Sequence, residues 1–200
     1  MGKGRLEAFS DGVLAIIITI MVLELRPPHE PTLEALRPLV PKFVSYVLSF
    51  VYIGIYWNNH HHLLQAVRRV NGRILWANMH LLFWLSLVPF VTAWMGETGF
   101  SSWPFAAYGI VMLFAGVAYF ILTRLLIAHH GEDSPILKAV GHDYKGQVSV
   151  GLYLLAIPFA FLEPRVSFAV FVIVAVMWLI PDRRIERTLA KHEHEEHAGH

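Results

Sequence analysis

The chain has 200 residues, of which 56% are hydrophobic and 16% are charged, and its formal net charge at pH 7 is +1. Soluble globular domains carry about a quarter charged residues, so this composition excludes an ordinary soluble domain and indicates an integral membrane protein. Cysteine is absent, which excludes disulfides and thiolate ligands or nucleophiles, whereas the 12 histidines are unusual.

Six apolar segments predict an all-α, polytopic membrane protein. They cover residues 6–25, 41–65, 74–95, 104–127, 147–163 and 165–181. With the N-terminus inside, only Arg26, Arg37, Lys42 and Arg165 of the 16 basic residues lie outside, as the positive-inside rule requires. We therefore expect residues 1–182 to form one six-helix transmembrane domain with both termini cytoplasmic.

The first segment is expected to be a retained helix rather than a signal peptide, because no small-residue cleavage pattern follows Glu24. Between Asp11 and Glu24 the apolar run "GVLAIIITIMVL" covers only about 18 Å as a helix, against about 30 Å of bilayer hydrocarbon. This shortness favours a helix that the other five spans shelter from lipid and that lines an aqueous path.

One face of this helix carries Gly12, Ile16, Thr19 and Leu23, which are spaced by four, three and four residues. Spacing alone favours a packing stripe in which Thr19 bonds back to its own helix. Asp11 favours a path instead, since ionisable groups inside spans face partners, cavities or water.

Arg5 precedes Asp11 by six residues, a spacing that favours contact with a neighbouring helix or subunit over contact with Asp11 itself. Ser10 or Asp11 could also act as an N-terminal cap, accepting hydrogen bonds from the first free amides. The two roles are compatible.

The second span ends in "YWNNHHHLLQAVRR", where His60, His61 and His62 point about 100° apart and cannot share one metal ion. Neither an i,i+4 histidine pair nor an HExxH motif is present, which argues against a catalytic zinc site. We expect one of these imidazoles to pair with Asp11 or Ser10. His80, in the third span, is expected to make an interhelical hydrogen bond rather than to carry protons.

The C-terminal residues 183–200 form a polar tail rich in histidine and glutamate. Its histidines could hold a divalent metal loosely, but a solvated tail is favoured, because flexible tracts of this composition bind metal without function. They are His192, His194, His197 and His200.

Three ordered blocks resemble the prokaryotic transmembrane protein 175 family of potassium channels. "RLEAFSDGVLAIIITIMVLEL" is similar to the first-helix signature of the family, Arg-x-x-x-Phe-Ser-Asp. "YWNNHHHLL" is similar to its second-helix Trp-x-x-His-His block, and "ANMHLLFWLSLVPFVTAW" to its third-helix block, here Asn78, Pro89, Phe90 and Thr92. The match is concentrated in residues 5 to 97.

This resemblance implies a potassium-selective leak channel in a prokaryotic plasma membrane. It implies a homotetramer with four copies of the first helix around the ion path, K⁺ as the permeant ion, no cofactor, no nucleic-acid partner and no enzymatic activity. It places the constriction at Ile16 and Leu23, with Thr19 facing the path between them. It also implies a network that tethers the first helix to its neighbours, formed by Arg5, Phe9, Ser10, Asp11, Trp57, His60 and His61.

A transporter and a membrane-embedded enzyme are the alternative classes of function. A proton-coupled secondary transporter could use Asp11, Glu24 and His80 as relay groups, but such transporters usually contain inverted repeats and no repeat is visible. Proton permeation through the same channel is a milder variant. A membrane-embedded enzyme is disfavoured, because no nucleophile–base pair or phosphate-binding loop is recognisable.

Overall fold

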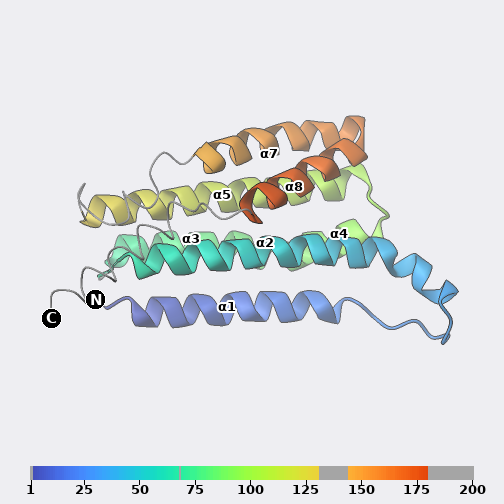
Figure 1. The fold of residues 1–200 in the computed structure, drawn as a ribbon, viewed down its shortest axis with the longest axis horizontal. Coiled ribbons are helices and arrows are strands. Elements are labelled where there is room, and N and C mark those ends of the chain that lie inside the picture. Colours follow the sequence, from blue (N-terminus) through green and yellow to red (C-terminus); the bar gives the residue numbers. More distant parts are fainter. Residues whose placement is uncertain (1, 68, 131–143, 180–200) are drawn as a thin grey trace, which may run out of the picture.

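The computed structural model of the chain describes residues 2–67, 69–130 and 144–179, which form an all-helical bundle apart from one isolated bridge between Gly2 and Arg69. The helices are α1 (Gly4–Leu23), the 3₁₀ helix η1 (Glu34–Leu39), α2 (Val40–Gln65), α3 (Gly72–Ser86), α4 (Val88–Glu97), α5 (Ser102–His130), α7 (Tyr144–Leu162) and α8 (Pro164–Leu179). They run back and forth in six passes, of which α3 and α4 share one (Figure 1). The prediction of an all-helical chain with about six helical passes is confirmed.

Within the described residues, five helical segments are long and apolar enough to cross a bilayer, with η1 counted together with α2 and α3 together with α4. The helix α8 is not one of these five, because its 16 residues cover about 24 Å, which is less than the hydrocarbon thickness. The sequence predicted this span to end at residue 181, and the described part of the chain ends at Leu179. The predicted tail, residues 183–200, lies outside the described residues.

The third pass is broken, whereas the sequence predicted one continuous span over 74–95. Proline has no N–H, and its ring clashes with the carbonyl four residues earlier, so a proline in the interior of an α-helix kinks or breaks the helix. The chain instead ends α3 at Ser86 and begins α4 at Val88, which places Pro89 in the first turn of the new helix. The two helices remain one path across the bundle (Figure 1).

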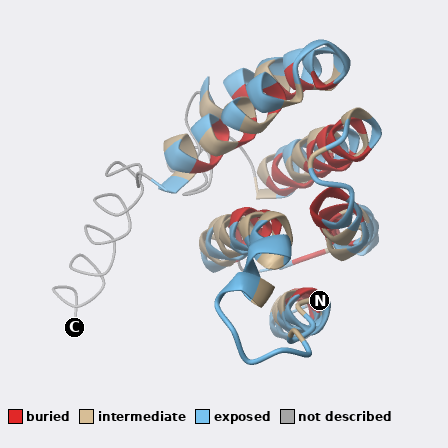
Figure 2. Cartoon of the chain, turned by 90° about the vertical axis from the view of Figure 1, so that its right-hand side faces the viewer, coloured by how far each residue is buried: buried red, intermediate tan, exposed pale blue. Residues whose placement is uncertain are grey.

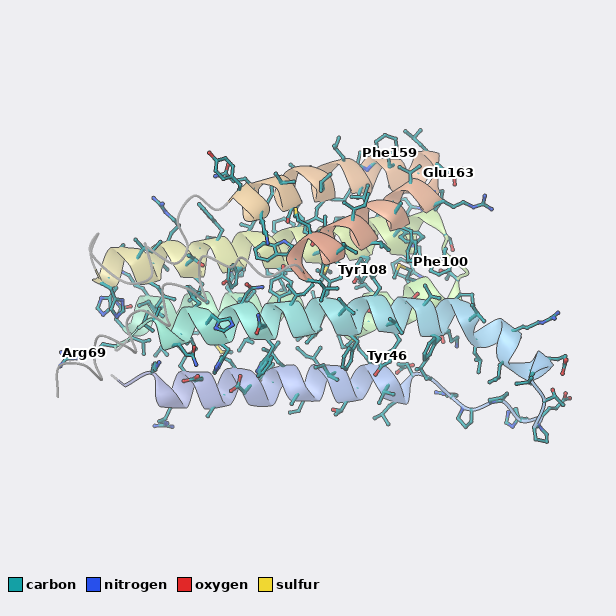
Figure 3. All side chains as sticks on the ribbon, viewed as in Figure 1. Tyr46, Arg69, Phe100, Tyr108, Phe159 and Glu163 are labelled. Atoms are coloured by element: carbon teal, nitrogen blue, oxygen red, sulfur yellow. The ribbon has the colours of Figure 1, made fainter. Side chains whose placement is uncertain are left out.

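The first helix lies at the edge of the bundle, where it packs against α2, α3 and α4 (Figure 1). We expected all five other spans to shelter it, and this expectation is wrong for the single chain. The central helix is α5, which packs against α3, α4 and α7 and so joins the two halves of the bundle. Seen from the end, α1 presents exposed surface on its outer side (Figure 2).

Buried hydroxyl groups connect the helices inside the bundle. The hydroxyls of Ser49 in α2 and Thr92 in α4 lie 2.7 Å apart, and Ser49 also donates to the hydroxyl of Tyr108 in α5 at 3.2 Å. The Tyr52 hydroxyl donates to the carbonyl oxygen of Phe171 at 2.7 Å, which joins α2 to α8. Lipid tails are as apolar as the helix surfaces, so the hydrophobic effect does not drive helices together within a membrane. Hydrogen bonds of this kind and close packing hold the helices together instead.

The crossing of α2 and α4 depends on a glycine. A Cβ atom on Gly96 would lie 2.7 Å from the backbone Cα of Lys42, closer than real Cβ contacts allow. Gly96→Ala should therefore push the two helices apart and lower the free energy of unfolding by about 1–3 kcal/mol. SDS-induced unfolding of the purified protein measures this loss. Gly54→Ala in α2 is the matched control, since nothing lies within 4 Å of its added Cβ, and it should be neutral or slightly stabilising.

Candidate functional site

The first helix has one buried face and one exposed face. Its buried residues recur at intervals of four, four, three and four, as expected for one side of an α-helix. They are Leu6, Ser10, Leu14, Ile17 and Met21. The hydrophobic pattern alone does not reveal this face, because the other side of the helix is also apolar.

The opposite face carries the residues that the sequence assigned to the ion path. Ile16 is 58% exposed and Leu23 is 75% exposed, and Gly12 and Thr19 are exposed as well. The Thr19 hydroxyl donates to the carbonyl oxygen of Ile16 at 2.9 Å, so it bonds back to its own helix. These four residues form a continuous stripe, here called the α1 stripe, and none of the other described helices buries it.

The buried face is fixed by a chain of hydrogen bonds that joins three helices. Ser10 donates to the carbonyl oxygen of Leu6 at 2.8 Å and accepts a bond of 2.9 Å from the side-chain nitrogen of Asn78 in α3. The Asn78 side-chain oxygen lies 2.7 Å from Nε2 of His60 in α2. Since an amide oxygen only accepts, Nε2 must carry the proton. The helices α1, α3 and α2 are thereby tied together inside the bundle, because all three side chains are buried.

A second set of contacts joins α1 to α2 closer to the surface. Nε1 of Trp57 donates to Oδ1 of Asp11 at 3.1 Å, and the Trp57 ring stacks on His61 with centroids 5.8 Å apart and an interplanar angle of 18°. Nδ1 of His61 lies 3.4 Å from Oε1 of Glu7, and its Nε2 lies 2.9 Å from the side-chain nitrogen of Gln65. Asp11 therefore has a partner on the neighbouring helix, as a carboxylate within a span requires.

The N-terminal end of α1 is held by a lysine. Nζ of Lys3 donates to the carbonyl oxygens of Leu64 and Gln65 at 2.7 and 3.3 Å. These carbonyls belong to the last turn of α2, where the helix dipole places partial negative charge. The contact holds the N-terminal end of α1 beside the C-terminal end of α2.

The structure thus brings together most of the residues predicted to tether the first helix. We expected one imidazole to pair directly with Asp11 or Ser10, and this detail is wrong: Asn78 stands between His60 and Ser10, and Trp57 binds Asp11. His61 pairs with Glu7 instead.

Arg5 and Phe9 are not joined to this network within one chain. Both side chains are exposed, and no hydrogen bond or ion pair links Arg5 to another of the described residues. On a helical wheel, Arg5 falls on the same face as the α1 stripe, seven residues before Gly12.

The sequence reading missed Asn78, Glu7 and Lys3 as members of the network. The role of Asn78 could have been predicted from the sequence, because an amide within an apolar span usually has a hydrogen-bond partner on another helix. The roles of Glu7 and Lys3 could not have been predicted, because charged residues are common at the ends of spans. Their partners also lie more than fifty residues away along the chain.

The prediction for His80 is wrong. Its Nε2 accepts a bond of 2.9 Å from Nε1 of Trp84, one turn later on α3, so the bond lies within one helix rather than between two. Trp84 in turn stacks on Phe114 of α5 with centroids 4.6 Å apart. Among the residues that the structure describes, no group of three or more His, Asp or Glu side chains is placed to hold a metal ion.

Comparison with known proteins gives consistent matches. Residues 5–89 match the family of the endosomal/lysosomal potassium channel TMEM175. A potassium channel of a Chryseobacterium species is 52% identical over 94% of this chain and 98% of its own length. The endosomal/lysosomal proton channel TMEM175 of Mus musculus is 26% identical over 86% of this chain but only 39% of its own length.

The fold is also known from a solved structure. The crystal structure of a lysosomal potassium-selective channel TMEM175 homolog from Chamaesiphon minutus superposes with a TM-score of 0.75, covering 89% of this chain and 96% of that one at 29% identity. Because relatives of this identity and coverage share both sequence and architecture, the chain belongs to the TMEM175 family of potassium channels.

Proposed function

We propose that this protein forms a potassium-selective leak channel in which four copies of α1 surround the ion path. The observation that carries the proposal is the α1 stripe, an exposed row of Gly12, Ile16, Thr19 and Leu23 on a helix whose other face is anchored by buried hydrogen bonds. One helix cannot enclose a pathway, so the path requires several copies of the chain. The names of the bacterial relatives support potassium as the permeant ion.

In this channel, rings of Ile16 and Leu23 form the constriction. Aliphatic side chains offer no ligands to an ion, so a narrow ring of them excludes water and closes the path by dewetting. Conduction then needs a small outward movement or rotation of the four helices. An ion that crosses must shed part of its hydration shell, and K⁺ sheds water at lower cost than Na⁺, which gives selectivity without a carbonyl filter.

Thr19 lies between the two apolar rings and supplies the polar group of the stripe. Its hydroxyl donates to the Ile16 carbonyl, which leaves the oxygen lone pairs free to face the path. Four such hydroxyls halfway along the constriction would partly replace the lost water. No bound cofactor is needed for this mechanism.

The hydrogen-bonded network sets the rotation of α1 about its own axis. The Ser10–Asn78–His60 chain and the Asp11–Trp57 bond hold two different sides of one turn of α1. A rotation that moved Ile16 out of the path would break these bonds. The network therefore positions the constriction. Arg5 is exposed on the same side of α1 as the stripe, and in the tetramer it would contact a neighbouring subunit.

Electrical recording tests the proposal directly. In planar bilayers containing the purified protein, with KCl on one side and NaCl on the other, we expect the reversal potential to lie close to the potassium equilibrium potential. The physical reason is the lower dehydration cost of K⁺ at the apolar rings. Protein-free bilayers are the control, and a zero reversal potential or no conductance would contradict the proposal.

A second candidate is proton permeation through the same path, which the names of the vertebrate relatives favour. A pH gradient imposed under symmetrical KCl separates the two functions, because only a proton conductance shifts the reversal potential under that condition.

A further inference from the structure

A cavity of about 420 Å³ lies on the other side of the bundle from α1. It is bounded by α2, α5, α7 and the end of α8, and its walls are mainly aromatic and aliphatic; they include Tyr52, Tyr56, Gly116, Phe120, Tyr153 and Trp178. Tyr52 and Tyr153 are buried and form its inner end, whereas Phe120 and Gln147 are exposed and form its rim. The cavity therefore opens on the surface of the membrane-spanning bundle.

The size and lining of the cavity indicate an apolar occupant. Ligand-binding cavities occupy about 300–1,000 Å³, whereas a single water molecule takes up about 30 Å³. Cavities lined by apolar side chains do not fill with water readily. For a cavity that opens within a bilayer, the apolar molecule present at high concentration is the phospholipid acyl chain.

Two cations stand at the rim of the cavity. The guanidinium carbon of Arg124 lies 6.0 Å from the centroid of the Phe120 ring, and Nζ of Lys145 lies 5.9 Å from the Trp178 ring. Both rings line the cavity, so cation–π contacts hold the two positive charges beside its opening. They lie at the end of the bundle where α5 ends and α7 begins. Positive side chains near the end of a membrane-spanning bundle attract the phosphate of a phospholipid.

We propose that this cavity binds a phospholipid, with one acyl chain between α2 and α7 and the phosphate beside Arg124 and Lys145. The site is separate from the α1 stripe, and its existence does not depend on which ion the channel conducts. A bound lipid would join α2, which anchors α1, to the α5–α7–α8 half of the bundle. It would thus be a structural lipid of the channel.

Two glycines allow a matched test. A Cβ atom on Gly116 would meet only the Tyr56 hydroxyl, at 3.9 Å, so a larger side chain there extends into the cavity without striking the backbone. Gly151 lies on α7 with nothing within 4 Å of its added Cβ, and it is exposed. The series Gly116→Ala, Val and Leu fills the cavity stepwise, and Gly151→Leu is the control.

The experiment uses the full-length protein in nanodiscs that contain a phosphatidylglycerol with a photoactivatable diazirine on its acyl chain. After illumination, mass spectrometry of the peptides locates the labelled residues. We expect labelling to concentrate on residues 116–120 and 146–153, to fall stepwise along the Gly116 series by at least fivefold at leucine, and to stay unchanged in Gly151→Leu. Labelling spread evenly over the apolar surface, or unaffected by Gly116→Leu, would overturn the proposal.

The phosphate contact has its own test in the same assay. The double variant Arg124→Gln/Lys145→Gln should lower the labelling of these peptides about fivefold, whereas Arg165→Gln, which removes an exposed charge at the start of α8, should not. Unchanged labelling in the double variant would overturn the assignment of the phosphate. Elution volume on size exclusion and helical content by circular dichroism establish that each variant is folded, and the milder Gly116→Ala and Gly116→Val variants carry the test if leucine is not tolerated.

Discussion

Ile16→Asn should raise the potassium current on the order of tenfold and bring the permeability ratio of K⁺ to Na⁺ close to one. In the proposed tetramer, four amides in place of four aliphatic side chains would hold water in the constriction and lower the dewetting barrier, and about 1.4 kcal/mol of barrier is worth a factor of ten in rate. The selectivity for K⁺ over Na⁺ also falls, because ions that keep their hydration shells no longer differ in the cost of dehydration. Currents and reversal potentials under paired K⁺ and Na⁺ gradients measure both effects.

The matched control for this variant is Ile173→Asn in α8. Ile16 and Ile173 are 58% and 57% exposed in the single chain, so both substitutions place an amide on an exposed apolar surface of a membrane helix. If the α1 stripe faces lipid, the two variants should behave alike, with poorer insertion and no gain of current. A gain confined to Ile16→Asn assigns the constriction to α1, whereas a gain in neither places the ion path on another helix.

The positions of the helices could be predicted from the sequence because each span carries its own hydropathy signal. The break at Leu87 is also a local effect, caused by Pro89, but hydropathy does not register it. The packing of α1 is different. Both sides of this helix are apolar, so the sequence did not reveal which side faces the bundle, and only the buried position of Ser10 opposite Thr19 resolves it.

The partners within the tether could not be predicted for a related reason. Ser10 and Asn78 are 68 residues apart in the chain, and three adjacent histidines in α2 offer donors in three directions. The resemblance named several of the residues that gather near Asp11 but not Asn78 or Glu7, and which side chains touch depends on the rotation of α1, α2 and α3 about their axes. That rotation is set by packing along the whole length of each helix rather than by the residues of the site.

Asn78→Leu should have the largest effect on stability. It removes two hydrogen bonds and leaves Nε2 of His60 without an acceptor in a buried position, where an unsatisfied polar group costs about 1–3 kcal/mol. We expect the free energy of unfolding to fall by about 2–4 kcal/mol, measured by SDS-induced unfolding in mixed micelles. Asn58→Leu is the control, because Asn58 lies on the exposed side of α2 and makes no hydrogen bond to the described residues; it should change stability by less than about 0.5 kcal/mol.

A triple variant distinguishes a lost network from a simple packing defect. In Ser10→Ala/His60→Leu/Asn78→Leu, no polar side chain of the buried Ser10–Asn78–His60 chain remains without a partner, and replacing all partners with apolar groups can be nearly neutral. Stability should therefore recover most of what Asn78→Leu loses. Channel selectivity should not recover, because only the Asp11–Trp57 bond is left to fix the rotation of α1 and the proposed Ile16 ring is no longer held in place. A triple variant as unstable as Asn78→Leu would show that leucine clashes at position 78, and one with wild-type selectivity would show that packing alone positions α1.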